Sequence, residues 1–351
     1  VHYSSEARGY ASLMLFLILA CWSRDRARQT GRTGWNLIYA ASCILGFLSH
    51  IAFLQFFAPA ATLDLISAIR GKTPNPSPTK KFTPLLLRIG IPSLFFSLFW
   101  LVSLRGMQIG GGNKADYLEI ILETLAISIG IPASPTGTLL GAVIALFLIV
   151  AVVVHLWSIG SDWALLFIGS AILMPALLLV LMGREDIYTR YFLIGIVFFQ
   201  WALGDWLGSL LQSPTQKQFR PVAVVLLFLF VAANGLQDAD LIRLGRSHYL
   251  EMLDDAANQS TSKPAYITAD HPFRQGMMLG FYLPRSPAAE KVQLATQPTH
   301  RPEWILVHGQ DPTLDQQTSI DHSQLGNFTL TKKYPAAKLS GWNLYLYHKS
   351  P

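Results

Sequence analysis

Long apolar stretches recur through residues 10–236 and carry almost no charge. A helix needs about 20 apolar residues to cross the hydrocarbon core of a membrane. Charged side chains make up only 14% of the chain, against about 25% in soluble proteins. The sequence therefore predicts a mainly α-helical polytopic membrane protein. We expect about eight crossings, over residues 10–22, 35–66 (as two), 82–104, 139–157, 163–182, 192–211 and 222–233.

Two of these regions need a special interpretation. Residues 35–66 are too long for one crossing, and Ser49-His50 lies at their middle, so we predict a tight hairpin of two short helices. Residues 118–131 are apolar but shorter than a crossing, and they end at Pro132. We interpret them as an interfacial or re-entrant helix, and the sequence leaves these two alternatives open.

The basic residues predict the orientation of the chain in the membrane. Residues 237–351 carry 11 basic and 11 acidic side chains, so the whole net charge of +6 belongs to residues 1–236. Lys and Arg concentrate in cytoplasmic loops. With alternating crossings, the basic segments 23–32, 70–81 and 217–220 all fall on one side. Membrane topology explains the basic excess better than nucleic acid does, and we expect no nucleic-acid partner.

The C-terminal residues 237–351 have the pattern of a soluble domain. Short segments rich in β-branched and aromatic residues predict strands at 265–269, 304–308, 328–331 and 344–348, and residues 241–257 predict a helix. Phosphate-binding glycine loops, metal-spaced Cys/His sets and nucleophile elbows are absent from this sequence. We expect a small α/β domain on the extracytoplasmic side, because the alternating crossings end there.

Several ionisable and aromatic residues lie at the predicted outer ends of the crossings. The chain opens with Ser4-Ser5-Glu6-Ala7-Arg8-Gly9-Tyr10, directly before the first apolar stretch. Arg190-Tyr191 precedes a late crossing, and His50 lies in the short outer hairpin. Ionisable groups at a membrane boundary are costly unless they are paired or functional.

These segments resemble the GT-C superfamily of membrane glycosyltransferases, of the ArnT and protein-mannosyltransferase type, which use polyprenyl-phosphate sugars. The resemblance rests on the "EAR-x-Y" pattern of Glu6, Arg8 and Tyr10, on the "RY" pair Arg190-Tyr191, on His50, and more weakly on the closing GWNLYLYHK. In that family the first pattern follows a few membrane helices, so the chain looks like one that lacks its N-terminal helices.

The resemblance implies transfer of a sugar from a polyprenyl-phosphate donor to a lipid, glycan or protein acceptor on the outer face. It implies donor-phosphate or substrate contacts for Glu6, Arg8, Tyr10, His50, Arg190 and Tyr191. The family's catalytic acid lies in the first outer loop, which we expect upstream of Val1. It also implies a bacterial inner membrane, with the C-terminal domain in the periplasm.

Each candidate has a structural alternative. Arg190 and Tyr191 fit an interfacial anchor, Glu6 and Arg8 a local ion pair, and His50 a satisfied helix end. Glu119 and Glu123 are weaker candidates; they share a helical face, which fits an acceptor contact or a solvated surface. Glu185 and Asp186 are also weaker candidates, and they fit a divalent cation, an acceptor or an exposed loop. No metal ligand set is predicted. Asp205 lies within a crossing and is expected to face the bundle interior.

Two other functions remain open. A degenerate relative would serve as a non-catalytic scaffold subunit in a larger membrane complex. A transporter is a third alternative, but the crossings carry few charges and show no inverted repeat.

Overall fold

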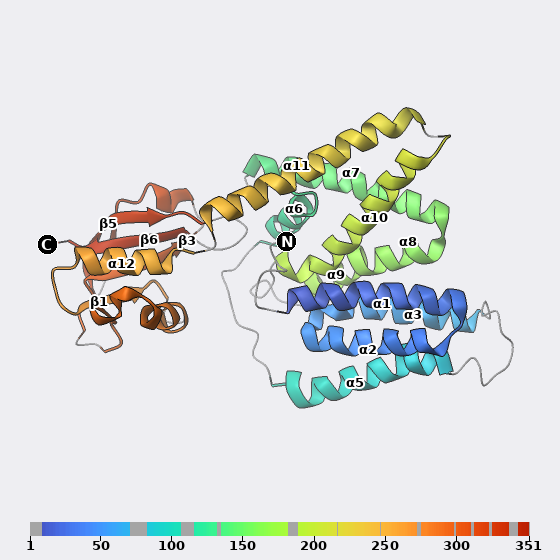
Figure 1. Cartoon of the computed structure of the whole chain (residues 1–351), viewed down its shortest axis with the longest axis horizontal. Coiled ribbons are helices and arrows are strands. Elements are labelled where there is room, and N and C mark those ends of the chain that lie inside the picture. Colours follow the sequence, from blue (N-terminus) through green and yellow to red (C-terminus); the bar gives the residue numbers. More distant parts are fainter. Residues whose placement is uncertain are drawn as a thin grey trace. The chain divides into compact units, whose positions relative to one another are not determined.

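The computed structural model describes residues 9–70, 83–106, 116–131, 135–181, 189–215, 217–245, 247–271, 275–297, 300–309, 312–322, 325–336 and 343–350. The chain divides into two compact units, Val1–Asn234 and Gly235–Pro351. Helices make up the first unit, and the second contains a six-stranded sheet (Figure 1).

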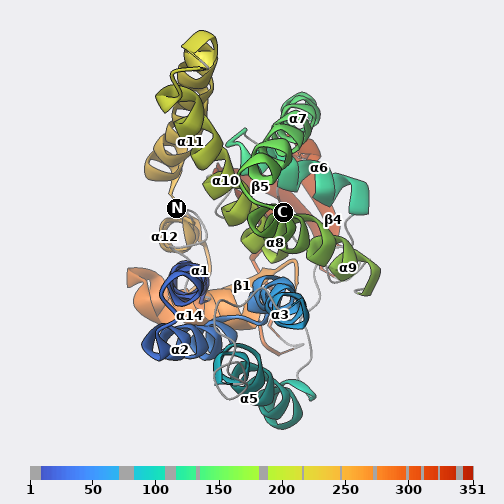
Figure 2. The ribbon, with the colours of Figure 1, turned by 90° about the vertical axis from the view of Figure 1, so that its right-hand side faces the viewer.

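The first unit begins with antiparallel helices. Figure 2 views several of them nearly end-on. Side-chain contacts fix their register: the Trp22 ring meets Trp35 edge-on with centroids 4.8 Å apart, and at the other end Tyr10 lies beside His50. The elements are α1 (Tyr10–Thr30), α2 (Thr33–Ser49), the 3₁₀ turn η2 (Ile51–Phe53), α3 (Leu54–Ile69), and a helix formed by η3 (Leu86–Gly90), α5 (Ile91–Phe99) and η4 (Trp100–Leu104).

The later helices of this unit share one apolar core with the first ones. Buried residues from α1, α2, α3, α7, α8 and α10 belong to a single cluster. The elements are α6 (Tyr117–Ser128), α7 (Pro135–Ile159), α8 (Ser161–Ile168), η5 (Gly169–Leu173), α9 (Met174–Leu181), the 3₁₀ turn η6 (Thr189–Phe192), α10 (Leu193–Gln212), η7 (Lys217–Phe219) and α11 (Arg220–Leu244).

Six helices among the described residues are long and apolar enough to cross a membrane, which indicates an integral membrane protein. They are Ile51–Ile69, Thr83–Leu104, Thr136–Ile159, Asp162–Leu181, Thr189–Gln212 and the run Lys217–Gln259. The expected count of about eight is not confirmed. The helix α2 has only 17 residues, and α1 carries four charged side chains in its second half: Arg24, Asp25, Arg26 and Arg28. The predicted hairpin over residues 35–66 corresponds to α2 and α3.

The basic segment 23–32, interpreted from sequence as a loop, is mostly helical. The helix α1 continues to Thr30 and ends at Gly31, whose φ of 65° is left-handed. The reason is tertiary: Ser23 and Arg24 are buried, and the Arg24 guanidinium donates to Asp64 of α3. A local charge count cannot reveal this partner, which lies 40 residues away.

A buried ionic cluster joins four helical segments of the first unit. Arg24 Nη2 donates to Asp64 Oδ1 at 2.8 Å, and the two side chains are only 5% and 4% exposed. Arg88 Nη1 lies 3.9 Å from Asp64 Oδ2, and its Nε donates to Asn36 Oδ1 at 2.5 Å. We call Arg24, Asn36, Asp64 and Arg88 the arginine cluster. Such a buried pair is expensive to break, since the remaining charge would lack compensation.

The second unit is an α/β domain with a mixed sheet in the order β2-β1-β3-β6-β5-β4. The pairs β1–β2 and β1–β3 are parallel, and β3–β6, β6–β5 and β5–β4 are antiparallel. All four segments predicted as strands lie in it. The elements are α12 (Tyr249–Gln259), β1 (Ala265–Ala269), η8 (Gln275–Leu279), α14 (Gly280–Tyr282), η9 (Leu283–Arg285), η10 (Pro287–Glu290), β2 (Val292–Leu294), β3 (Trp304–Gly309), η11 (Pro312–Asp315), β4 (Ser319–His322), β5 (Gly326–Tyr334) and β6 (Asn343–Lys349).

The alternation of side chains along the strands builds two apolar clusters in the second unit. Trp304, Leu306 and Leu346 pack with residues of α12, whereas Ile305, Tyr345 and Tyr347 belong to a separate cluster with Phe328. The predicted helix over residues 241–257 is divided between the end of α11 and α12, because Gly245, with a φ of 68°, interrupts it.

Replacing Asp64 by Asn should strongly destabilise the first unit, because two buried guanidinium groups would then share no counter-charge. We expect a loss of about 3–5 kcal/mol in the free energy of unfolding. The matched control is Asp162→Asn, which removes an exposed carboxylate paired with Arg28 and should cost about 1 kcal/mol or less. Unfolding of both variants in detergent micelles measures the difference, and equal losses would contradict the assigned role of Asp64.

Gly46 allows η2 to pack on α2, because a Cβ atom there would overlap the Phe53 ring. We expect Gly46→Ala to lower stability by about 1–3 kcal/mol. Gly34→Ala in the same helix meets no atom within 4 Å and should be neutral or slightly stabilising, since alanine favours helix more than glycine. Thermal unfolding of the two variants tests this contrast; a neutral Gly46→Ala would refute the tight contact.

Candidate functional site

Tyr10 and His50 meet at one end of the first unit, where α1 begins and α2 ends. Their rings lie 5.0 Å apart between centroids, and Tyr10 is almost fully buried. Gly9 makes this approach possible: its φ is 77°, and a Cβ atom there would collide with the Ser49 carbonyl oxygen. Only glycine combines the left-handed backbone with the absence of a side chain. We call this the Tyr10 end of the unit.

His50 is held in one tautomer at the Tyr10 end. Its Nδ1 accepts a hydrogen bond from the backbone N–H of Ala52 at 3.0 Å. The neutral ring therefore carries its proton on Nε2. Burial lowers the pKa of His50 below its ordinary value, and the positive charge of Arg190 lowers it further. The structure thus favours a neutral imidazole with one N–H donor.

Arg190 belongs to the 3₁₀ turn η6, which lies directly before α10. Its guanidinium carbon lies 5.6 Å from the centre of the Tyr191 ring, within the range of a cation–π contact. Gln55 of α3 holds the turn in place, because its Nε2 donates to the Tyr191 carbonyl oxygen at 2.6 Å. The Gln55 Oε1 atom is buried and accepts no hydrogen bond from the described part of the chain.

Glu123 reaches the same turn from α6. Its Oε2 accepts a hydrogen bond from Thr189 Oγ1 at 2.7 Å, next to Arg190 in sequence. Glu119, which shares a helical face with Glu123 in the sequence pattern, is exposed. The structure therefore connects one acid of this pair to the Tyr10 end.

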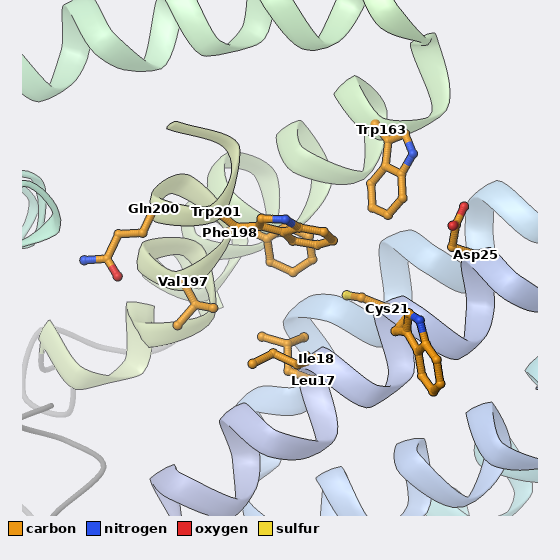
Figure 3. Close-up of a pocket in the computed structure, with 10 residues that line it drawn as sticks. Leu17, Ile18, Cys21, Asp25, Trp163, Val197, Phe198, Gln200 and Trp201 are labelled. Carbon is orange, nitrogen blue, oxygen red and sulfur yellow. The ribbon is translucent and has the colours of Figure 1, made fainter. Parts of the chain in front are cut away.

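A pocket of about 630 Å³ lies farther along α1 and α10. Figure 3 shows side chains of α1 facing those of α10 across it, with Trp163 from α8 completing the wall. Most of the lining is apolar, and the rings of Trp163 and Trp201 meet edge-on at 5.3 Å. Leu17 of the pocket follows Tyr10 by about 10 Å along the helix. From Leu17 the pocket lining continues along α1 to Asp25, so the pocket is a mostly apolar chamber beside the middle of this helix.

Four of the sequence candidates lie outside the described residues: Glu6, Arg8, Glu185 and Asp186. Tyr10 lies against His50, and the charge of Arg190 acts on His50. Tyr191 contacts Arg190, and Glu123 is hydrogen-bonded to Thr189, which precedes Arg190. Within the described residues, no three His, Cys, Asp or Glu side chains form a group able to hold a metal ion.

Asp205 does not face the bundle interior as expected. Its side chain is 53% exposed, and its Oδ2 atom lies 3.0 Å from His155 Nε2 of α7. The pair joins two neighbouring helices. The expectation failed because the partner His155 lies near the end of α7, where the two helices leave the carboxylate accessible.

Sequence reasoning missed two polar groups that the fold makes important. Gln55 follows the hairpin histidine by five residues, and no local pattern marks it. In the second unit, His308 is fully buried: Nδ1 contacts Asp270 Oδ1 at 2.7 Å, and Nε2 contacts the Tyr249 hydroxyl at 2.9 Å. Because Tyr249 and His308 are themselves buried, this network joins the residue after β1 to β3 and α12 and serves the fold.

Comparison with known proteins finds no matching family model, no matching curated protein and no matching solved structure.

The lowered pKa of His50 gives a direct test of its electrostatic interaction with Arg190. Replacing Arg190 by Gln should raise the pKa of His50 part of the way towards its ordinary value of 6.5, because one of its two causes is removed. Since the folded pKa is depressed, the neutral ring contributes stability above pH 6.5, and that contribution is lost as the pH falls through the folded pKa. NMR titration of labelled histidines measures the shift.

Arg105→Gln is the matched control for this titration, because Arg105 is an exposed arginine. It should leave the His50 pKa unchanged. An unchanged His50 pKa in the Arg190 variant would show that the two groups do not interact.

Proposed function

We propose that this protein is a GT-C-type membrane glycosyltransferase. It transfers a sugar from a polyprenyl-phosphate donor to a lipid, glycan or protein acceptor on the extracytoplasmic face. The observation that carries the proposal is the Tyr10–His50 contact, within reach of the charge of Arg190, in a helical unit where α1 and α10 also line an apolar pocket. A lipid phosphate needs both parts, a polar site for its head and an apolar space for its chain.

Arg190 is the proposed contact for the donor phosphate. A guanidinium binds two phosphate oxygens through parallel charge-assisted hydrogen bonds. The cation–π contact with Tyr191 and the hydrogen bond from Gln55 to the Tyr191 carbonyl fix the turn that carries Arg190. Preorganised positive charge is most valuable where negative charge develops. In the proposed reaction this is the phosphate, which leaves as the acceptor oxygen forms its bond to the anomeric carbon.

His50 supplies a neutral donor beside Arg190. Its Nε2–H can hydrogen-bond a phosphate oxygen without adding a second full charge to a half-buried site. The Ala52 N–H holds the ring by Nδ1, so the donor direction is set before the ligand arrives. Preorganisation of this kind lowers the entropy lost on binding.

The pocket lined by α1, α8 and α10 is the proposed site for the start of the polyprenyl chain. Its apolar wall and three tryptophan rings suit a branched, unsaturated hydrocarbon. Burial of such a chain is favourable by about 25 cal/mol per Å² of apolar surface removed from water. The separation of about 10 Å between Tyr10 and Leu17 lets one lipid occupy both places.

Glu123 is the proposed acceptor contact. It lies on a helix beside the phosphate site and is already oriented by Thr189. General-base catalysis requires a carboxylate within hydrogen-bond reach of the acceptor hydroxyl. The carboxylate takes up the proton of that hydroxyl. We assign Glu123 to acceptor binding and leave the base unassigned.

Binding of farnesyl phosphate to the purified full chain tests this proposal, with farnesol as the ligand that lacks the phosphate. We expect Arg190→Gln to weaken farnesyl phosphate binding by about tenfold or more, since charge-assisted hydrogen bonds are lost. Tryptophan fluorescence should change when the farnesyl group enters the pocket, because Trp163, Trp201 and Trp22 line it. Trp201→Phe should reduce that signal.

The exposed Arg105 again provides the matched control. Arg105→Gln should bind farnesyl phosphate as the parent chain does. If the parent protein binds neither farnesyl phosphate nor longer polyprenyl phosphates, the donor site does not exist, and the non-catalytic scaffold subunit becomes the better explanation.

A further inference from the structure

The arginine cluster carries one more positive than negative charge. Arg24 and Arg88 share the single carboxylate of Asp64, and all three side chains are at least 88% buried. In the described part of the chain, neither guanidinium has another acidic partner. The carboxylate of Asp162 is already paired with Arg28, so it does not serve as a counter-charge for the cluster. A buried net charge is costly unless a counter-charge compensates it.

Donors remain available in this cluster. Arg24 donates hydrogen bonds to Asp64 from Nε and from Nη2. Arg88 donates one to Asn36 from Nε. A guanidinium has five N–H donors in a planar fork. Several donors of the two arginines therefore have no acceptor among the described residues. Their number and planarity favour an oxyanion with several acceptor oxygens.

The Tyr39 hydroxyl is a second, independent sign of a missing ligand. Tyr39 is fully buried, and its hydroxyl makes no hydrogen bond with a nitrogen or oxygen atom in the described part of the chain. Tyr39 interacts electrostatically with both Arg24 and Arg88. The Cys43 thiol beside it is only a weak partner. Buried polar groups without a partner are rare in native structures.

We propose that Arg24, Arg88 and the Tyr39 hydroxyl bind a phosphate group at this end of the helical unit. A phosphate accepts two parallel bonds from an arginine and one more from a hydroxyl, and its charge balances the cluster. This site is separate from the Tyr10 end: on α1, Arg24 follows Tyr10 by about 21 Å.

The phosphate belongs to a lipid headgroup or to a free phosphate ion. The cluster lies beside the second half of α1, which carries the basic residues Arg24, Arg26 and Arg28, on the predicted cytoplasmic side. The Arg88 side chain is 12% exposed. Its helix, Thr83–Leu104, packs little against the rest of the protein: only 11% of its most apolar stretch is buried. These features favour a lipid that approaches from the bilayer.

The experiment uses the full chain in bilayer nanodiscs of phosphatidylcholine with or without phosphatidylglycerol. Native mass spectrometry counts retained lipids, and thermal unfolding measures stabilisation. We expect one strongly retained phosphatidylglycerol and a higher melting temperature in its presence. Arg88→Gln should weaken retention by about tenfold, because it removes a charge-assisted contact. It leaves the neutral Arg24–Asp64 pair in place.

Two further variants keep the test decisive. Arg105→Gln removes an exposed arginine that follows the same helix and should retain the lipid as the parent does. Tyr39→Phe keeps every charge and should also reduce the retention of phosphatidylglycerol. If Arg88→Gln fails to fold, the Tyr39 variant still tests the phosphate site. Inorganic phosphate in phosphatidylcholine nanodiscs forms the second arm: stabilisation there, lost in Tyr39→Phe, identifies a free phosphate ion as the ligand.

The proposal is overturned if neither phosphatidylglycerol nor inorganic phosphate stabilises the protein. Equal effects of Arg88→Gln and Arg105→Gln would overturn it as well, because they would indicate a general effect of net charge. Unchanged retention in Tyr39→Phe would exclude the hydroxyl as a ligand and overturn the site as described. None of these outcomes depends on sugar transfer at the Tyr10 end.

Discussion

The contact of Asp64 with two arginines determines how the helices of the first unit are arranged. A buried carboxylate between Arg24 and Arg88 is tolerable only when α1, α3 and the helix that begins at residue 83 bring all three groups together. A slip of one helical turn moves a side chain by about 5.4 Å and would separate the charges. The cluster therefore adds an electrostatic constraint to the register that the Trp22–Trp35 and Tyr10–His50 ring contacts also set.

This register has consequences at the opposite end of the same helices. Because α1 is continuous from Tyr10 to Thr30, fixing Arg24 also fixes Tyr10. The glycine at position 9 then brings α1 against Ser49, and the His50 ring lies beside the tyrosine ring at a tilt of 32°. A structural ion pair thus supports the polar site that we connect with donor binding. The two ends differ in chemistry: one carries the arginine cluster, and the other carries the half-buried His50 beside Tyr10.

Much of the helical architecture could be predicted, since apolar length is a local property. The hairpin at His50, the late helices and the four predicted strands of the second unit follow from such patterns. The count of crossings could not be predicted, because α1 mixes an apolar half with a charged half. For the candidate site, His50, Arg190 and Tyr191 were found from short patterns, but Gln55 and Thr189 carry no local signal.

The sequence by itself determined the membrane class, the division into helical and sheet-containing parts, and the list of ionisable residues near the helix ends. These depend on composition and on neighbours within about one helical turn. Tertiary structure alone decided which charges meet. Asp64 lies 40 residues from Arg24, and Thr189 lies 66 residues from Glu123. Electrostatic partners at such separations depend on how the whole bundle packs, and a single sequence does not record that packing.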